Sequence, residues 1–417
     1  MVGHLRQGAD DFGLTGLPRL PSPGPTTRIR SSATERAHRG PDLLDPRPQK
    51  VVRSGQTEAD EETTDASREM QPLPRVALAA CTRGCPGPRL REWLFWHLSK
   101  GVCLMLLRWE GPMDKEQRAA LSGPLARGEV ILLTQAFKGQ ASGSFQRVMT
   151  RQIKFVHQAL EVAQQHGCHF LLHLDDDELL FPKEPGQTIP ELLRRHIGTT
   201  KRCIHFENLE AVFSFEVDSS RPFSRPSTRF RTQHHVLYCN GKSAANLTAP
   251  GQVFASGVHH FCRHDRSFVE ACESYGLHDE GAGCTHSDCC IQEWEAVVLH
   301  FDSPSLTEWH AKFRTRAAAS LNALDKEEML LFPFKQESID ALRKASSKRA
   351  AQEQQRVYRH WRCLPGRGEP QEVFDDRLCG QHVEAEFASM LLEARALQAL
   401  ERTRSECEAV NSNTRNE

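Results

Sequence analysis

The chain has 417 residues, of which 39% are hydrophobic and 26% charged, and its formal net charge at pH 7 is −1. This length allows two or three domains, or one large α/β domain with tails. Because the acidic and basic residues nearly balance, the molecule as a whole lacks the charge of a nucleic-acid-binding protein, and no nucleic-acid partner is expected.

The first 70 residues are rich in Pro, Arg, Ser, Asp and Glu and contain few apolar runs. Such a segment cannot bury enough surface to offset the entropy of ordering, so a disordered tail is expected over residues 1–70. It contains no recognisable signal peptide, which favours a cytoplasmic location. The most apolar stretch, residues 93–109, includes Lys100 and Arg108, so no transmembrane segment is expected.

From Arg75 onward, short apolar runs alternate with amphipathic segments, a pattern typical of an α/β fold. The order predicts a largely parallel central sheet flanked by helices, and ligands bind such sheets at the carboxyl ends of the strands. A helical C-terminal extension follows, and its end is expected to be disordered after about Arg402. The predicted strands are 76–80, 102–107, 130–133, 169–174, 203–213, 236–240 and 296–301, and the predicted helical segments are 90–98, 145–165, 307 onward, 346–356 and 387–400.

An acidic cluster, Asp175 to Glu178, directly follows the strand predicted at 169–174, and an apolar run follows the cluster. Adjacent carboxylates repel one another unless a cation offsets their charge, and oxygen ligands suit Mg²⁺ or Mn²⁺. In an extended D-x-D segment, Asp175 and Asp177 point to one side and Asp176 to the other. A solvated acidic turn is the alternative interpretation, but hydrophobic residues on both sides favour a metal site.

The segment Leu171–Leu180 resembles the D-x-D-E segment of glycosyltransferases of families 2 and 92. This resemblance implies a GT-A-like domain over residues 71–340, between the tail (1–70) and the helical extension (341–417). It also implies a nucleotide-sugar donor and Mn²⁺ or Mg²⁺ as cofactor. Other segments resemble family motifs in the expected order: Arg89–His97 (E-W-L-x-x-H), Asn208–Ala211, Gly241–Ser243 (G-K-S), Gly257–Phe261 (G-x-H), Val298–Ser303 (L-H-Y) and Trp309–Phe313 (W-x-x-K-F).

Asp175 and Asp177 are the expected metal ligands, and the resemblance adds His259 as the third. His260 and His300 are the alternatives for that third position. A metal held there stabilises the negative charge that develops on the leaving diphosphate.

Three further residues are expected to bind the donor, namely Glu110, Lys242 and Asp176. Lys242 would contact a phosphate as a point charge. An inverting enzyme also needs a carboxylate base, and Glu178 and Asp302 are the candidates, with Glu207 and Glu210 as alternatives. A retaining mechanism stays open.

Five of the fourteen cysteines lie between residues 262 and 290. Zinc ligation, disulfides and free thiols are all open for this segment, although its irregular spacing lacks paired C-x₂-C knuckles.

Two alternatives to the glycosyltransferase hypothesis come from other classes. Residues 82–86 and 108–114 depart from the family pattern, which favours a non-catalytic GT-A-like binding protein. A metal-dependent phosphohydrolase is the weaker alternative, because the sequence has no second acidic or histidine cluster. The acceptor, whether glycan, lipid or protein, is not predicted. By family resemblance, the Golgi or secretory pathway is an alternative to the cytoplasm.

Overall fold

A computed structural model describes residues 72–133, 145–214, 223–231, 241–255, 261–262, 290–318, 333–344, 347–363 and 374–413. The expected disordered tail, the strand expected at 236–240 and the expected metal ligand His259 lie outside these residues. Residues 263–289 of the cysteine-rich segment also lie outside the described residues.

Ten of the described strands form one sheet, in which β3, β2, β1 and β4 run parallel to one another. The order continues through β8, β6 and β7 to β12 with antiparallel pairings, and β11 joins β6 in parallel and β5 in antiparallel. β9 and β10 form a separate pair. The strands are β1 (Val76–Thr82), β2 (Leu104–Trp109), β3 (Val130–Leu132), β4 (Phe170–His173), β5 (Glu178–Pro182), β6 (Cys203–Val212), β7 (Arg229–Arg231), β8 (Lys242–Asn246), β9 (Phe254–Ala255), β10 (Phe261–Cys262), β11 (Cys290–His300) and β12 (Phe374–Cys379).

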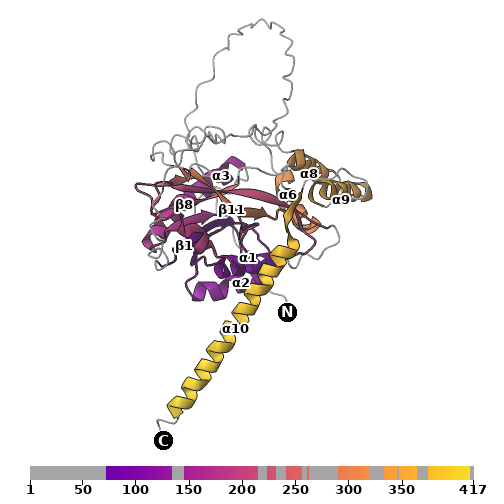
Figure 1. The fold of residues 1–417 in the computed structure, drawn as a ribbon. Coiled ribbons are helices and arrows are strands. Elements are labelled where there is room, and N and C mark those ends of the chain that lie inside the picture. Colours follow the sequence, from indigo (N-terminus) through magenta and orange to yellow (C-terminus); the bar gives the residue numbers. More distant parts are fainter. Residues whose placement is uncertain are drawn as a thin grey trace, which may run out of the picture. The chain divides into compact units, whose positions relative to one another are not determined.

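Helices cover both faces of the sheet, as Figure 1 shows for α1 and α2 on one side and α3 on the other. The residues of β1 alternate between the two cores, because successive side chains of a strand point to opposite faces. Val76 and Leu78 pack with α1, whereas Ala77 and Ala79 pack with α3. The helices are α1 (Gly87–Ser99), α2 (Lys115–Ala126), α3 (Phe145–Gln165), α4 (Ile189–Arg194), α6 (Leu306–Ala318), α8 (Pro333–Arg343), α9 (Lys348–Arg362) and α10 (Gly380–Asn413).

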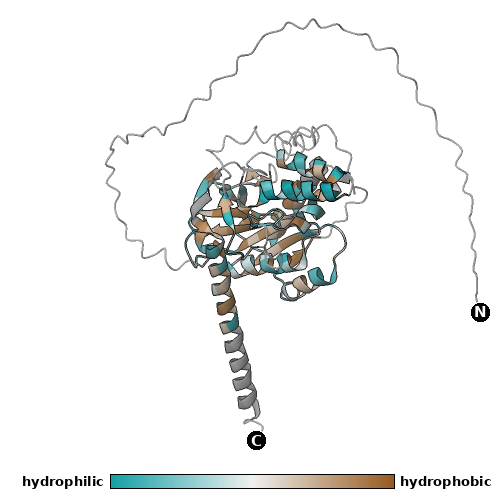
Figure 2. Ribbon diagram, turned by 90° about the vertical axis from the view of Figure 1, so that its right-hand side faces the viewer, coloured by the Kyte–Doolittle hydropathy of each residue, from teal (hydrophilic) through white to brown (hydrophobic). Residues whose placement is uncertain are grey.

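The predicted α/β fold, with a largely parallel central sheet flanked by helices and a helical C-terminal extension, is confirmed. Apolar residues gather in the central strands, and polar residues predominate on the surrounding helices (Figure 2). None of the described helices combines the length and hydropathy needed to span a bilayer.

α1 shows how the sequence fixes a boundary: Pro88 lies in its first turn, and Gly101 follows its last turn with a φ of 90°. The helix also holds β5 in place. The indole N–H groups of Trp93 and Trp96 donate to the backbone carbonyls of Glu178 and Leu180, at 2.8 and 3.1 Å. These bonds satisfy buried acceptors on the edge of β5 that none of the described strands pairs with.

The C-terminal extension is built into the fold. β12 pairs with β7 and so adds a strand to the sheet, and α8 and α9 share a core with α6. The start of α10 packs on α1, where the Phe387 ring lies 4.9 Å from that of Trp96. α10 continues to Asn413, past the point near Arg402 where the sequence predicts disorder.

Removing the Phe387 ring should destabilise the protein. We expect Phe387→Ala to lower the free energy of unfolding by about 3 kcal/mol, because the substitution leaves a cavity between α10 and α1. Leu392 lies on the same helix but is 65% exposed, so Leu392→Ala should change stability by less than about 0.5 kcal/mol. Urea unfolding measures both, and equal effects of the two substitutions would contradict the docking of α10.

A buried acid links α4 to β11. The Glu293 carboxylate lies 2.8 Å from His196 Nε2 and accepts a hydrogen bond from Arg195 Nε at 3.0 Å. Burial alone would raise the pKa of Glu293, but these hydrogen bonds lower it from the ordinary 4.5 to about 2. Because the folded-state pKa lies below the unfolded value, this group's contribution to stability is present above pH 4.5. The contribution is lost as the pH falls toward 2.

The acid sensitivity of folding should therefore depend on Glu293. Between pH 5 and pH 3, we expect the wild-type protein to lose about 2 kcal/mol more stability than Glu293→Gln, which does not titrate. Urea unfolding at the two pH values gives this difference directly. If both proteins lose the same amount of stability, protonation of Glu293 does not cause the loss of stability in acid.

Candidate active site

The acidic cluster forms a tight turn between β4 and β5, not the extended segment expected from the sequence. The Glu178 N–H donates to the Asp175 carbonyl at 3.2 Å, and the Asp175 N–H donates to the Glu178 carboxylate at 2.7 Å. The Phe301 N–H donates to the Asp177 carbonyl at 2.7 Å and ties the turn to the end of β11. In this turn, the three aspartates point toward three different partners.

Asp175 pairs with Lys242, whose ammonium lies 2.7 Å from the Asp175 carboxylate and 3.4 Å from Glu178. β8 runs antiparallel to β4, so its first residue, Lys242, lies beside the carboxyl end of β4. Gly241 makes this possible: its φ is 61°, and a Cβ there would lie 2.0 Å from the Phe206 carbonyl oxygen. Lys242 is completely buried, and although burial lowers its pKa, the two carboxylates raise it overall.

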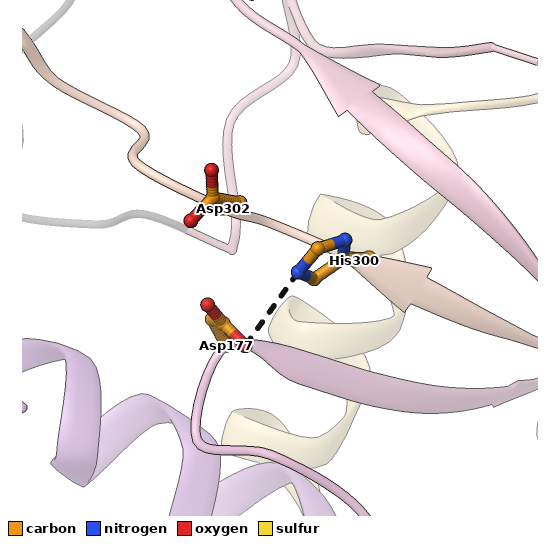
Figure 3. Close-up of side chains that lie close together, drawn as sticks. All are labelled: Asp177, His300 and Asp302. Carbon is orange, nitrogen blue, oxygen red and sulfur yellow. Dashed lines mark ion pairs between the residues drawn. The ribbon is translucent and has the colours of Figure 1, made fainter. Parts of the chain in front are cut away.

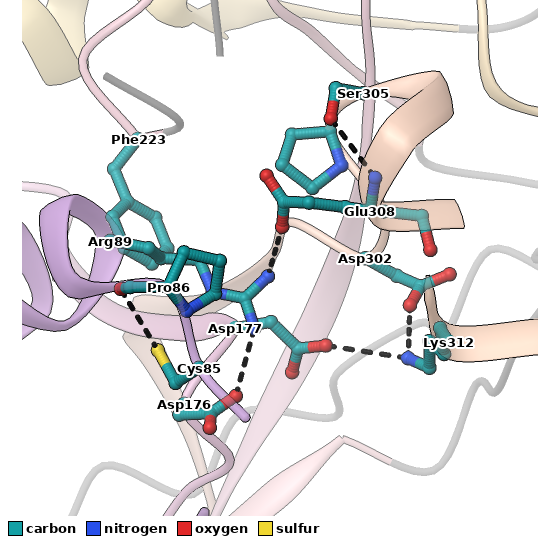
Figure 4. A network of polar contacts seen from close by, with 12 residues as sticks. Cys85, Pro86, Arg89, Asp176, Asp177, Phe223, Asp302, Ser305, Glu308 and Lys312 are labelled. Carbon is teal, nitrogen blue, oxygen red and sulfur yellow. Dashed lines mark hydrogen bonds and ion pairs between the residues drawn. The ribbon is translucent and has the colours of Figure 1, made fainter. Parts of the chain in front are cut away.

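Asp176 faces α1 (Figure 4). Its carboxylate accepts hydrogen bonds from the Thr82 hydroxyl and, at 3.2 Å, from the Arg89 guanidinium. Arg89 also donates to Glu308 of α6 at 2.6 Å, so one buried guanidinium joins the acidic turn to two helices. Thr82 is the last residue of β1, and Arg89 lies in the first turn of α1. Ligands of open α/β sheets bind in this region, beyond the carboxyl ends of the strands.

Asp177, His300 and Asp302 form a candidate metal centre at the end of β11 (Figure 3). Each side chain offers one ligand atom, and these atoms lie within 4.8 Å of one another. Ligands on opposite sides of a divalent cation are about 4 to 5 Å apart, so the spacing suits such an ion. The predicted alternative His300 thus belongs to this group, whereas Asp175 does not. The predicted set of Asp175, Asp177 and His259 stays a prediction.

The chemistry of this group fits a divalent cation. Asp302 Oδ2 is buried and has no hydrogen-bond partner among the described residues. A buried oxygen without a partner is available to bind a cation. Its surroundings are also densely charged, because acidic and basic side chains gather around it. The carboxylates are those of Asp175, Asp176, Asp177, Glu178, Asp302 and Glu308, and the basic groups are Arg89, Lys242, Lys312, Arg225 and Arg362.

Lys312, on α6, lies between two members of the candidate metal centre. Its ammonium is 3.5 Å from the Asp177 carboxylate and pairs closely with Asp302 (Figure 4). Burial alone would raise the pKa of Asp177, but Lys312 and His300 hold it well below its usual range. Burial alone would lower the pKa of His300, but the Asp177 carboxylate 3.7 Å from Nε2 raises it.

The backbone that carries Asp302 is clamped by groups from elsewhere in the chain. The Arg362 guanidinium at the end of α9 donates to the Asp302 carbonyl at 3.1 Å, and the Tyr358 hydroxyl donates to the Ser303 carbonyl at 3.2 Å. Arg225 donates to the next carbonyl, that of Pro304, at 3.0 Å. Ser303 has a φ of 49°, which costs energy in a non-glycine residue, so the clamp holds a strained backbone in place.

The other predicted site residues are engaged within the protein. Glu110 accepts two hydrogen bonds from Arg151, at 2.9 and 3.1 Å. Glu178 is completely buried and closes the acidic turn. Of the alternative bases, Glu210 pairs with Arg231 at 3.5 Å, whereas Glu207 is exposed. The roles predicted for Glu110, Lys242, Asp176, Glu178 and Asp302 stay predictions.

The sequence assigns no role to Arg89, Lys312 or Arg362. Arg89 and Lys312 lie inside segments that carry the family resemblance. Their basic side chains in those segments could have indicated that they pair with the acidic cluster. Arg362 gave no such signal, because its partner is a backbone carbonyl 60 residues away in the chain.

Comparisons with known proteins give a weak similarity. No protein-family model matches the chain. A glycosyltransferase-like protein of Arabidopsis thaliana is 21% identical over 317 residues, which cover 67% of this chain and 57% of that protein. This chain therefore matches little more than half the length of that relative. The solved structure of mannose-1-phosphate geranyltransferase from Thermus thermophilus matches 69% of this chain and 68% of its own, with 12% identity. Its TM-score of 0.19 is too low to carry an argument.

The Arg362 clamp should contribute measurably to stability. We expect Arg362→Met to lower the free energy of unfolding by about 2 kcal/mol, because it leaves a buried carbonyl without its donor. Arg359, one turn earlier on α9, is exposed, so Arg359→Met should cost less than about 0.5 kcal/mol. Thermal or urea unfolding distinguishes the two variants. An Arg362→Met protein as stable as Arg359→Met would show that Arg362 does not stabilise the backbone at Asp302.

Proposed function

We propose that this chain is a divalent-metal-dependent glycosyltransferase that moves a sugar from a nucleotide-sugar donor to an acceptor. The main support is the cluster of Asp177, His300 and Asp302 at the carboxyl end of the sheet, within 4.8 Å of one another. The ordered set of family motifs and the weak similarity to a glycosyltransferase-like protein agree with it.

In this proposal, Asp177, His300 and Asp302 hold Mn²⁺ or Mg²⁺, and Asp302 changes from a predicted base to a ligand. The bound ion supplies Lewis-acid stabilisation of the leaving diphosphate. The protein's own residues fix the geometry: Arg362 holds the Asp302 backbone, and the Phe301 N–H holds the Asp177 backbone. Asp175 is paired with Lys242, so it would support the acidic turn instead of binding the ion directly.

Glu178 remains a predicted base, but its carboxylate is completely buried and bonded to the Asp175 N–H, so that role would require the turn to open. Lys242 remains a predicted phosphate contact, although it is equally buried. Glu110 and Asp176 remain predicted donor contacts, and both are paired with arginines.

Binding of UDP and GDP tests this proposal. We expect one of them to bind the full chain in the presence of Mn²⁺ and not in EDTA, because a cation held by Asp177, His300 and Asp302 would supply the positive charge that attracts the diphosphate. Asp177→Asn should weaken binding at least about tenfold, which is about 1.4 kcal/mol. The exposed Asp340 on α8 offers a matched control, and Asp340→Asn should bind like the wild type. Isothermal titration calorimetry measures the affinity of the wild type with Mn²⁺ and with EDTA, and that of each variant with Mn²⁺.

The contrary outcome is equally informative. If the folded protein binds neither nucleotide with or without metal, the catalytic proposal fails, and a non-catalytic GT-A-like binding protein is the better description. Turnover of phosphate esters without nucleotide binding would favour the phosphohydrolase alternative.

A further inference from the structure

Resting on the proposed metal site, we infer that Lys312 is a built-in cation that occupies the position of the divalent metal between Asp177 and Asp302 and is displaced when the metal binds. The ammonium contacts carboxylates of both residues, which supply two of the three candidate ligands. A metal bound by the two oxygens that the ammonium contacts, Asp177 Oδ2 and Asp302 Oδ1, would lie where the ammonium lies. The two cations repel each other at such separations, so they compete for these oxygens.

The two lysines of the acidic site differ in their freedom to leave it. The Lys242 side chain is 1% exposed, whereas that of Lys312 is 36% exposed. Lys312 also has a flexible four-carbon stem and lies on a helix surface, so its ammonium can swing into solvent without moving the backbone. Lys242 is therefore a permanent part of the acidic turn, and Lys312 is the exchangeable cation.

This exchange gives Lys312 two effects of opposite sign. Without metal, its charge offsets the repulsion between Asp177 and Asp302 and stabilises the folded chain. In the presence of metal, it competes for the same carboxylates, so the observed metal affinity is reduced by the fraction of molecules in which the ammonium occupies the site. At low metal concentration, the Lys312 ammonium would therefore occupy the site. Because Lys312 lies on α6, the metal affinity would also depend on the position of that helix.

The first test is Mn²⁺ titration of the full chain by calorimetry, without nucleotide. We expect Lys312→Met to bind Mn²⁺ at least about tenfold more tightly than the wild type and to unfold at a lower temperature in EDTA, but not in saturating Mn²⁺. Lys312→Arg keeps the charge and should bind no more tightly than the wild type. Lys344 is 54% exposed and pairs with Glu353 away from the site, so Lys344→Met should bind Mn²⁺ like the wild type.

The displacement itself has a second readout that needs no substitution. Acetylation of lysines by an amine-reactive ester, followed by mass spectrometry, should modify Lys312 at least about threefold faster with Mn²⁺ than with EDTA, because the metal frees the ammonium from its carboxylates. The rate at Lys344 should be unchanged by the metal, as an internal control.

The outcomes separate this inference from the proposed function. If Lys312→Met and the wild type bind Mn²⁺ with equal affinity, or if Mn²⁺ leaves the acetylation rate of Lys312 unchanged, the role of Lys312 is refuted while the metal site stands. If neither protein binds Mn²⁺, the metal site itself is wrong and this inference fails with it.

Discussion

The structure depends on the neutralisation of carboxylates gathered at one end of the sheet. Like charges at such close range would drive the acidic turn apart or protonate it, unless cations lie among them. Arg89 and Lys242 answer this requirement from buried positions, and each reaches the turn from a different secondary-structure element. One buried carboxylate oxygen, Asp302 Oδ2, still has no hydrogen-bond partner among the described residues, so the cluster keeps one position that suits a further cation.

Strand order explains why these groups meet. β1, β2 and β4 are parallel, so their carboxyl ends share one edge, and antiparallel β8 brings its first residue to the same place. β11 ends at His300, opposite the first residue of β5. Asp177 and His300, which are more than a hundred residues apart in the chain, are thereby brought within a few ångströms of each other. Beyond β11, Arg362 at the end of α9 holds the Asp302 backbone in place.

Local pattern was sufficient to predict most of the sheet and the position of the acidic cluster after β4, because apolar runs and the acidic cluster are contiguous in sequence. α2 escaped prediction, although Asp114 and Gln117 form a capping box at its start. The conformation of the acidic cluster was predicted wrongly, because the pattern of aspartates does not show that Glu178 reaches back to Asp175. The pairing of Lys312 with Asp177 and Asp302 depends on how α6 packs, and residue spacing carries no information about that.

The late position of β12 has a consequence for biosynthesis. β7, near residue 230, gains its second neighbour only when residues 374–379 are available, and the core around Trp96 is closed only by Phe387. During translation, a chain that has emerged as far as Asp302 already contains every candidate metal ligand but lacks part of its sheet. Contacts of such long sequence separation form slowly, so the fold is completed only after residues 374–387 have left the ribosome. Until then, the unpaired edge of β7 is a surface that a chaperone would need to cover.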